Sequence, residues 1–303
     1  MKDFIAICNC SVPELHELLT ESSSLKAFYK LGGRDLCLAG KTLAMLFEKP
    51  SLRTRLSFQV AMTDLGGSPI YVKPEDIGGI GKREPVKDIA RVLSRYVQGI
   101  MARTFEHQTV LDLAQYADVP VINALTDWSH PCQAMADVLT IREHFGHIEG
   151  IKTAFIGDGN NVARSLAFAA GKLNMKLVVA SPRGYELDEE TIQKANALTP
   201  SCTTQVRDPY EAVAEADVIY TDTWVSMGQE NEKAKRQSDF AGYAVDAKLV
   251  AAAPRHVKIM HCLPAYRGYE ITDEVAESPG SIIFDQAENR LHFQRALLKT
   301  LMA

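Results

Sequence analysis

Short apolar runs alternate with longer amphipathic segments along most of the chain. A short apolar run is typical of a buried strand, and apolar residues at three- and four-residue steps are typical of a helix. The first complete pair is the run 42–47 and the segment 52–65, which Pro50 separates. Glycines 66 and 67 follow the segment and indicate where its helix ends.

The same rhythm continues to the end of the chain and predicts two domains. Ser11 and Pro13 mark the start of a first helix that lasts to about Leu31. The pattern predicts a first set of strands at 42–47, 69–72, 99–103 and 120–124, with helices at 52–65, 86–96, 110–116 and 131–145. It predicts a second set at 152–156, 176–180, 217–221, 257–260 and 281–284, with helices at 162–173, 189–198 and 287–301.

Strands that alternate with helices form parallel sheets covered by helices. We therefore expect an α/β fold with two doubly wound parallel-sheet domains in tandem. The predicted domains are 1–146 and 147–286, and the C-terminal helix, 287–303, is expected to return to the first domain.

Composition and charge limit the classes of partner. The 303 residues include 46% hydrophobic residues, enough for two cores, and 33 basic against 38 acidic residues give a net charge of −5. This balance argues against nucleic acid or an anionic membrane as the main partner. The six cysteines show neither the paired spacing of metal ligands nor a regular disulfide framework. No apolar run suits a signal peptide or a membrane span. We expect a cytoplasmic protein without disulfides.

The segment Ser51-Leu52-Arg53-Thr54-Arg55 is the strongest local signal for a ligand. Ser51 is a good N-cap, so Arg53 and Arg55 fall in the first helical turn. The helix dipole disfavours cations there unless an anion joins them, and the exposed N–H groups of that turn also favour an anion. The segment therefore indicates phosphate binding, with a solvated helix end as the alternative.

Ligands of open parallel sheets bind beyond the carboxyl ends of the strands, where this chain is polar. Arg103 follows the third predicted strand, and His130 and Gln133 follow the fourth. They add a cation, a titratable donor and an amide to the edge that carries Ser51. Arg290, at the start of the last helix, is a further candidate for this anion site. The glycine-rich segment 76–85 is either a plain connection or a substrate-closing loop.

The second domain offers amide, carboxylate and hydroxyl groups. Its first strand leads into Gly157-Asp158-Gly159-Asn160-Asn161, but Val162 stands where a dinucleotide fingerprint needs its third glycine. Asn160 and Asn161 instead offer amide groups at a helix start, or serve as a turn and N-cap. Asp222 and Ser226 suit the ammonium and carboxylate groups of an amino acid.

Cys262 follows another predicted strand, directly after His261. It is a candidate ligand contact, a nucleophile or an ordinary buried thiol. The sequence has no protease-like Cys-His-Asn signature, and two adjacent residues seldom form a metal site alone. We therefore predict no metal site.

Taken together, these motifs resemble the aspartate/ornithine carbamoyltransferase family over nearly the whole chain. Ser51 to Arg55 and His130-Pro131-Cys132-Gln133 match motifs shared by the family. The segment Asp222 to Gly228 and His261-Cys262-Leu263-Pro264 match the ornithine branch. The resemblance implies transfer of a carbamoyl group from carbamoyl phosphate to the side-chain amine of L-ornithine, which gives L-citrulline in arginine metabolism, and it leaves open whether arginine is made or broken down. It also implies no cofactor, and a homotrimer whose active sites lie between subunits.

The resemblance also implies the site residues. Carbamoyl phosphate would be bound by Ser51, Leu52, Arg53, Thr54, Arg55, Arg103, His130, Pro131, Cys132, Gln133, Cys262, Leu263 and Arg290. Ornithine would be bound by Asn161, Asp222, Ser226 and Met227. The residues implied to take part in catalysis are Arg53, Arg55, Arg103, His130, Asp222 and Cys262.

One position departs from the family. Gly79 stands where many ornithine enzymes have a glutamine that reaches carbamoyl phosphate in a neighbouring subunit, and Lys82 or the loop backbone is a possible replacement. Three alternative functions stay open at this point. They are carbamoylation of another amine, such as putrescine or an acylated ornithine, a phosphate-sensing binding protein, and a dehydrogenase.

Overall fold

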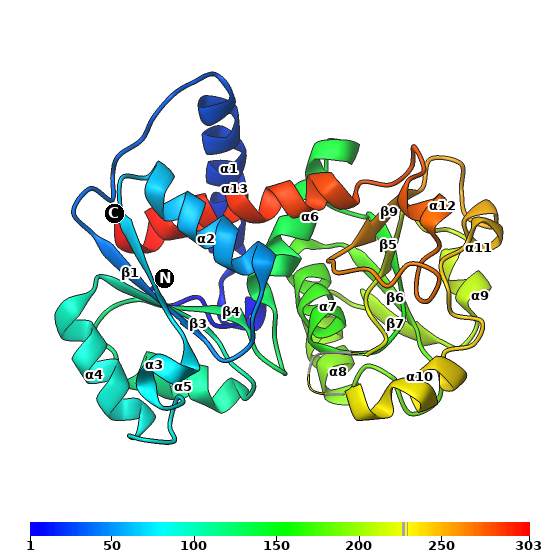
Figure 1. Ribbon diagram of the computed structural model, residues 1–303. Helices are drawn as coiled ribbons and strands as arrows, with labels where there is room; N and C mark the ends of the chain where they lie inside the picture. Colours follow the sequence, from blue (N-terminus) through cyan, green and yellow to red (C-terminus); the bar gives the residue numbers. More distant parts are fainter. Residues whose placement is uncertain (226–227, 229) are drawn as a thin grey trace. The chain divides into compact units, whose positions relative to one another are not determined.

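The computed structural model describes residues 1–225, 228 and 230–303. The chain divides into two compact units. Unit 1 contains Met1–Leu139 and Glu288–Ala303, and unit 2 contains Thr140–Ala287. Each unit is built on one parallel sheet, which confirms the predicted fold class, and the last helix contributes most of its length to unit 1 (Figure 1).

Unit 1 has a four-stranded sheet in the order β2-β1-β3-β4. The strands are β1 (Thr42–Phe47), β2 (Ser68–Val72), β3 (Gly99–Arg103) and β4 (Val121–Leu125). The helices of this part of the chain are α1 (Val12–Lys30), α2 (Leu52–Asp64), α3 (Pro74–Ile77), α4 (Val86–Tyr96), α5 (His107–Tyr116), α6 (Pro131–Phe145) and α13 (Ile283–Met302), with a 3-10 turn at Ile7–Asn9.

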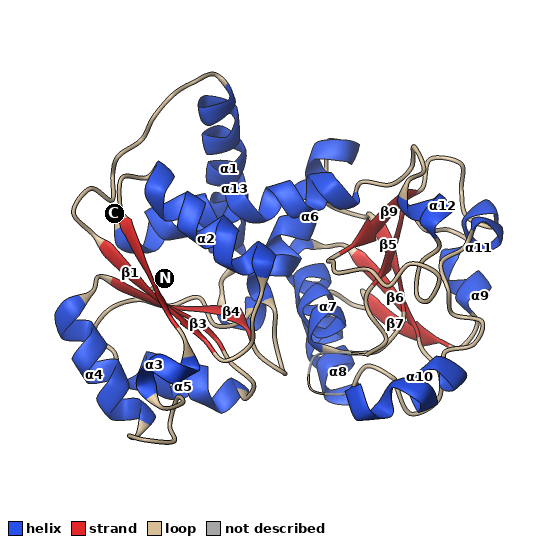
Figure 2. Ribbon diagram, in the orientation of Figure 1, coloured by secondary structure: helices blue, strands red, loops and turns tan. Residues whose placement is uncertain are grey.

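Helices cover both faces of this sheet (Figure 2). On one face, Ile89 of α4 and Val110 of α5 pack against Ala44 and Ile100 of the central strands. On the other face lie α2 and the end of α13. Gly99 allows that helix to approach, because a Cβ atom at Gly99 would stand 2.8 Å from the sulfur of Met302.

Unit 2 has a five-stranded sheet in the order β7-β6-β5-β8-β9. The strands are β5 (Lys152–Ile156), β6 (Lys176–Ala180), β7 (Thr203–Val206), β8 (Val218–Thr221) and β9 (Lys258–His261). The helices are α7 (Asn161–Leu173), α8 (Glu189–Leu198), α9 (Pro209–Val213), α10 (Lys233–Asp239), α11 (Ala247–Ala251) and α12 (Asp273–Ala276), with a 3-10 turn at Glu230–Glu232. Helices α7 and α8 cover one face, and α9, α11 and α12 cover the other.

Two details of the predicted strands were wrong. The run 281–284 is not a strand, since Ser281 forms only one bridge, to Ile259, and α13 begins two residues later. Its apolar residues are instead the buried start of that helix, where Ile282 and Ile283 are buried and Phe284 is 62% exposed. Strand β7 was not predicted, because its sequence Thr-Thr-Gln-Val is mostly polar, as suits an edge strand.

Each sheet has a topological switch point, where successive connections leave a strand towards opposite edges of the sheet. In unit 1 the chain leaves β1 for β2 on one side, and β3 lies on the other; in unit 2 β5 has the same relation to β6 and β8. Ligands of open α/β sheets bind at such points, beyond the carboxyl ends of the strands. The segments after β1, β3, β5 and β8 are therefore the places to look for a site.

Candidate active site

The carboxyl edge of the unit 1 sheet gathers polar side chains around Thr54. Ser51 caps helix α2, and its hydroxyl accepts from the backbone N–H of Thr54. The Thr54 side chain is buried, and its oxygen Oγ1 accepts from Nη1 of Arg103 at 3.4 Å and from Nη2 of Arg290 at 3.3 Å. Two guanidinium groups from distant parts of the chain thus meet on one hydroxyl at a helix N-terminus.

Gln133 extends this cluster. Its carbonyl oxygen accepts from Nη1 of Arg290, and its amide nitrogen donates to Oδ1 of Asp137 at 2.8 Å. Asp137 lies one helical turn after Gln133 in α6, so the carboxylate fixes which end of the amide faces the arginine. The sequence analysis did not identify Asp137 as a member of the site, although its four-residue spacing from Gln133 was a usable signal.

The electrostatics of the cluster keep His130 neutral. His130 is 5% exposed, and burial is the largest cause of a pKa held well below the usual histidine range. Arg290, Arg103 and Arg53 lower the pKa of His130 further, because a second positive charge among them is unfavourable. The imidazole can therefore serve as a neutral hydrogen-bonding group beside three cations.

Two other predicted site residues of unit 1 differ in burial: Arg55 is exposed and Cys132 is buried. Arg55 is exposed, donates to Gln59 and lies 4.1 Å from the centre of the Tyr71 ring, so a role in binding the ligand requires it to exchange these contacts for the ligand. Cys132 is buried, its sulfur lies 3.4 Å from the carbonyl oxygen of Asn123, and burial raises the pKa of its thiol to about 12. Cys132 is thus a packed neutral thiol rather than a reactive one.

The carboxyl edge of the unit 2 sheet carries a second polar group around Asp222. Asp222 follows β8 and is 7% exposed. Its oxygen Oδ1 accepts from the sulfur of Cys262 at 2.9 Å and from the backbone N–H of Thr223 at 2.7 Å. Its oxygen Oδ2 accepts from the amide of Asn160 at 2.8 Å. Asn161, the predicted ornithine contact, is the first residue of α7.

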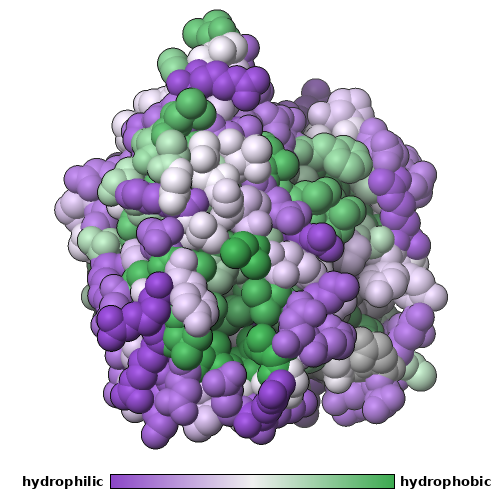
Figure 3. Space-filling view, turned by 60° about the vertical axis from the view of Figure 1, so that its left-hand side comes forward, coloured by the Kyte–Doolittle hydropathy of each residue, from purple (hydrophilic) through white to green (hydrophobic). Residues whose placement is uncertain are grey.

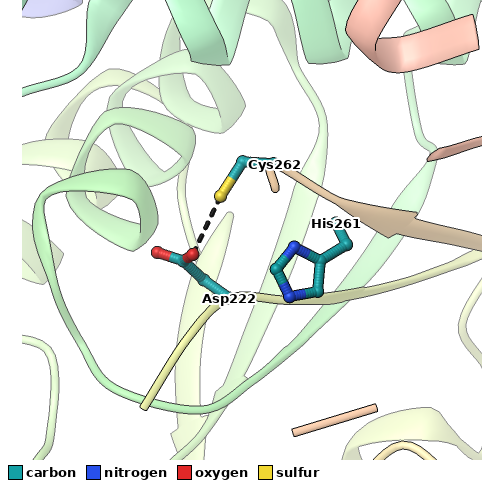
Figure 4. A group of neighbouring side chains, drawn as sticks. All are labelled: Asp222, His261 and Cys262. Carbon is teal, nitrogen blue, oxygen red and sulfur yellow. Dashed lines mark hydrogen bonds between the residues drawn. The ribbon is translucent and has the colours of Figure 1, made fainter. Parts of the chain in front are cut away.

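His261 stands beside this group, but its ring nitrogens have partners of their own. Oδ1 or Oδ2 of Asp222, a ring nitrogen of His261 and the sulfur of Cys262 lie within 4.8 Å of one another (Figure 4). However, Nδ1 of His261 accepts from the backbone N–H of Leu263 at 2.8 Å, so the proton is on Nε2, which lies 3.2 Å from Glu270. Both ring nitrogens are engaged, and the arrangement favours orientation of the 261–263 backbone over metal ligation.

Two predicted ornithine contacts, Ser226 and Met227, lie outside the described residues.

The glycine-rich segment 76–85 is described. Gly79 has a φ of 87°, a conformation that glycine adopts easily. A Cβ atom at Gly79 would stand 2.9 Å from the Lys82 side chain. The backbone at this position therefore favours glycine over the glutamine that the sequence resemblance leads us to expect. Among the described residues, no helix is long and apolar enough to cross a membrane.

Comparisons with known proteins agree for both units. The family model described as the carbamoyl-P binding domain of aspartate/ornithine carbamoyltransferase matches residues 2–143, and the model of the Asp/Orn binding domain matches residues 149–301. The chain is 49% identical to the anabolic ornithine carbamoyltransferase of Pyrococcus furiosus, with 99% of this chain and 96% of the relative covered. It is 47% identical to ornithine carbamoyltransferase of Methanoculleus marisnigri, with 100% and 97% covered.

Solved structures give the same result. The chain resembles ornithine carbamoyltransferase from Pyrococcus furiosus with a TM-score of 0.96 at 48% identity, covering 99% of this chain and 97% of the other. It resembles the enzyme from Thermus thermophilus with a TM-score of 0.91 at 44% identity, covering 100% and 99%. The two domain matches, the full-length identities and the shared fold show that this chain belongs to the aspartate/ornithine carbamoyltransferase family.

Proposed function

We propose that this chain transfers the carbamoyl group of carbamoyl phosphate to the side-chain amine of L-ornithine and releases L-citrulline and phosphate. The observation that carries the proposal is the cluster of Arg103, Arg290, Gln133 and His130 around the Thr54 hydroxyl at a helix N-terminus. This set suits a ligand that has both phosphate oxygens and a carbonyl group. The names of the similar proteins support the same substrates.

In the proposed reaction the neutral amine of ornithine attacks the carbamoyl carbon. A carbon–nitrogen bond forms, the bond from that carbon to the phosphate oxygen breaks, and the departing phosphate takes the proton that the amine loses. Arg53, Arg103 and Arg290 neutralise the phosphate, while Thr54, Arg55 and neutral His130 donate to the carbonyl oxygen as it gains charge. Loss of one such donor typically costs about 2.7–4 kcal/mol in the transition state.

The second substrate is assigned to unit 2. The Asp222 carboxylate accepts from Cys262 and Asn160 and suits the α-amino group of ornithine. Asn161, Ser226 and Met227 are proposed as further ornithine contacts, and Cys262 and Leu263 as further contacts of carbamoyl phosphate. Putrescine lacks the amino-acid head group that Asp222 and Ser226 suit, and acylation would remove the ammonium charge at the group that Asp222 binds.

The test is to supply carbamoyl phosphate with a panel of amines and to measure ureido product and phosphate together. We expect equal amounts of both with L-ornithine and little product with putrescine or acetylated ornithine. Arg103→Gln should lose turnover, and Asp222→Asn should raise the KM for ornithine while the KM for carbamoyl phosphate changes little. Phosphate release without ureido product, or preference for another amine, would contradict the proposal.

We also propose a homotrimer in which helix α2 lies at the interface. Leu52, Leu56 and Val60 are 70%, 49% and 42% exposed and follow one another at four-residue steps along α2, and Ile70 on edge strand β2 is 51% exposed. An apolar helix stripe of this kind favours burial against a partner. Exposed hydrophobic patches between hydrophilic residues are also visible in Figure 3. Leu56→Glu should lower the mass measured by light scattering from three chains to one.

A cytoplasmic location and the biosynthetic direction complete the proposal. None of the six cysteines, all of which lie in the described part of the chain, is in a disulfide bond, as expected in a reducing compartment. The 49% identical relative from Pyrococcus furiosus is named anabolic. We therefore propose that the chain makes citrulline for arginine biosynthesis.

A further inference from the structure

Asn160 connects the two segments of unit 2 that carry the proposed ornithine contacts. It follows strand β5, and Asp222 follows the neighbouring strand β8. The amide nitrogen of Asn160 donates to Oδ2 of Asp222 at 2.8 Å. The sequence identified Asn160 as an amide at a helix start, but the contact with a residue 62 positions away is visible only in the structure.

The orientation of the Asn160 side chain is fixed by its other contacts. Its carbonyl oxygen Oδ1 accepts from the backbone N–H groups of Val162 at 2.9 Å and Ala163 at 3.2 Å, and so caps helix α7. Backbone N–H groups can only donate, so the oxygen of the amide must face the helix. The amide NH2 group is consequently left to face Asp222.

Asp222 is thereby held on both oxygens. Oδ1 accepts from the Thr223 backbone and from Cys262, and Oδ2 accepts from Asn160. The side chain is 7% exposed, so these donors take the place of water as hydrogen-bond partners of its two oxygens. Of these three donors, only Asn160 also controls the helix that begins with Asn161.

We propose that Asn160 is a positioning residue for the second substrate. It aims the Asp222 carboxylate at the α-amino group of ornithine, and its helix cap places Asn161 for the same substrate. Asn160 acts through these two residues and does not itself touch the reacting atoms. The inference rests on the proposed function, since it assigns ornithine to Asp222.

Two variants separate the contact with Asp222 from the helix cap. Asn160→Ser keeps a good N-cap residue but removes the amide that reaches Asp222. Asn160→Asp keeps both the cap and the shape, but it places a carboxylate oxygen against Asp222. The matched control is Asp246→Ala, which removes the N-cap of helix α11, where the Asp246 side chain accepts from the N–H of Leu249 at 2.8 Å.

The expected result for Asn160→Ser is a change in one Michaelis constant. Loss of a hydrogen bond to a charged group should raise the KM for ornithine about ten- to a hundredfold, while the KM for carbamoyl phosphate changes less than about twofold. Asp246→Ala should lower the melting temperature and leave both KM values unchanged. A role in helix capping alone would make Asn160→Ser resemble the wild type in its ornithine KM.

Asn160→Asp adds a pH dependence that capping cannot produce. Two carboxylates in contact share a proton at low pH, and the protonated Asp would then donate to Asp222 as Asn160 does. The ratio of the ornithine KM of this variant to that of the wild type should therefore be largest near pH 9 and fall as the pH is lowered to about 6. Because aspartate caps helices as well as asparagine does, a capping role predicts a constant ratio.

Wild-type ornithine KM values in both Asn160 variants at every pH would overturn the inference. So would an equal rise of both KM values together with a lower melting temperature, which would indicate general loss of structure. Failure of the proposed function is a different outcome, because the unaltered chain would then form no ureido product from ornithine. The inference would fall with it.

Discussion

Replacing Arg290 by methionine should abolish phosphate binding and lower the stability of the unliganded protein by no more than about 3 kcal/mol. Arg290 is 3% exposed and meets Arg103 on the oxygen of Thr54. The donor nitrogens lie 3.4 and 3.3 Å from that oxygen, so they are no more than the sum of these distances apart, and two like charges at about that separation repel by on the order of 3 kcal/mol at an effective dielectric constant of about 20. Each lost hydrogen bond, to Thr54 and Gln133, contributes about 1.5–3 kcal/mol in the opposite direction. The two bonds together contribute about 3–6 kcal/mol, so relief of the repulsion offsets between half and all of their loss, which leaves a net destabilisation of about 0–3 kcal/mol.

The loss of ligand binding can be measured separately from this change in stability, because it appears as a smaller shift in Tm when the ligand is added. A ligand at about one hundred times its Kd stabilises the folded state by about 2.7 kcal/mol. At about 2 °C per kcal/mol, the wild type should gain about 5 °C in Tm with saturating carbamoyl phosphate or inorganic phosphate. Arg290→Met should gain less than about 1 °C at the same concentration. Thermal unfolding with and without each ligand measures both values.

Arg295→Met is the matched control on the same helix. Arg295 is also 3% exposed, but it pairs with Asp64 and lies 3.8 Å from the centre of the Tyr29 ring. Its replacement leaves a carboxylate without its cation, so the Tm of the free protein should fall while the shift with phosphate is kept. The reasoning is refuted if Arg290→Met instead lowers the Tm of the free protein and retains the full shift.

Three more changes have predictable signs. The pKa of His130 is lowered in the fold, so its contribution to stability is complete above about pH 6.5 and is lost as the pH falls below that value; in His130→Gln, urea unfolding should show a smaller loss between about pH 6.5 and 5. Arg236→Met should lower the free energy of unfolding by about 3–5 kcal/mol, because Arg236 is 6% exposed and pairs with Asp158 at 2.7 Å; Asp158→Asn in the same chain should recover part of this loss. Gln294→Met should raise the free energy of unfolding by about 1–2 kcal/mol, because Gln294 is fully buried and its amide atoms have no hydrogen-bond partner among the described residues; an unchanged urea midpoint would contradict this.

The fold could be predicted from the sequence to the extent that its strands are apolar. The run that became β1 is buried at five of its six positions, and such a run is recognisable without any neighbour. Strand β7 is polar and exists because it pairs with β6, a contact that local sequence does not encode. The run at 281–284 is apolar because it starts a buried helix, and a short apolar run does not distinguish these two cases.

The site could be predicted as a list of residues but not as a set of contacts. The helix start at Ser51 was enough to predict an anion site, because capping and the helix dipole are local properties. The approach of Arg290 to Thr54 depends on how the last helix folds back onto unit 1, and it joins residues 236 positions apart. Asn160 was recognised by its cap, whereas its contact with Asp222 depends on the adjacency of β5 and β8.

Anion binding in unit 1 should be coupled to proton uptake by His130. Burial is the largest cause of the low pKa of His130. Because only 5% of the side chain is exposed in the unliganded protein, a bound anion can add little further desolvation. An anion about 4 Å from the ring would instead favour the protonated form by on the order of 4 kcal/mol at an effective dielectric constant of about 20. The charge effect therefore exceeds the desolvation effect, and the pKa of His130 should rise towards its usual range when an anion binds.

Calorimetry with sulfate, a tetrahedral dianion that does not titrate near neutral pH, tests this coupling. Measured near pH 6 in two buffers of different ionisation enthalpy, the wild type should take up a fraction of a proton for each sulfate bound, and His130→Gln should take up less. By linkage, sulfate should then bind the wild type more tightly as the pH falls, and the variant should lack this part of the pH dependence. Equal proton uptake by the two proteins would show that a bound anion does not change the protonation of His130.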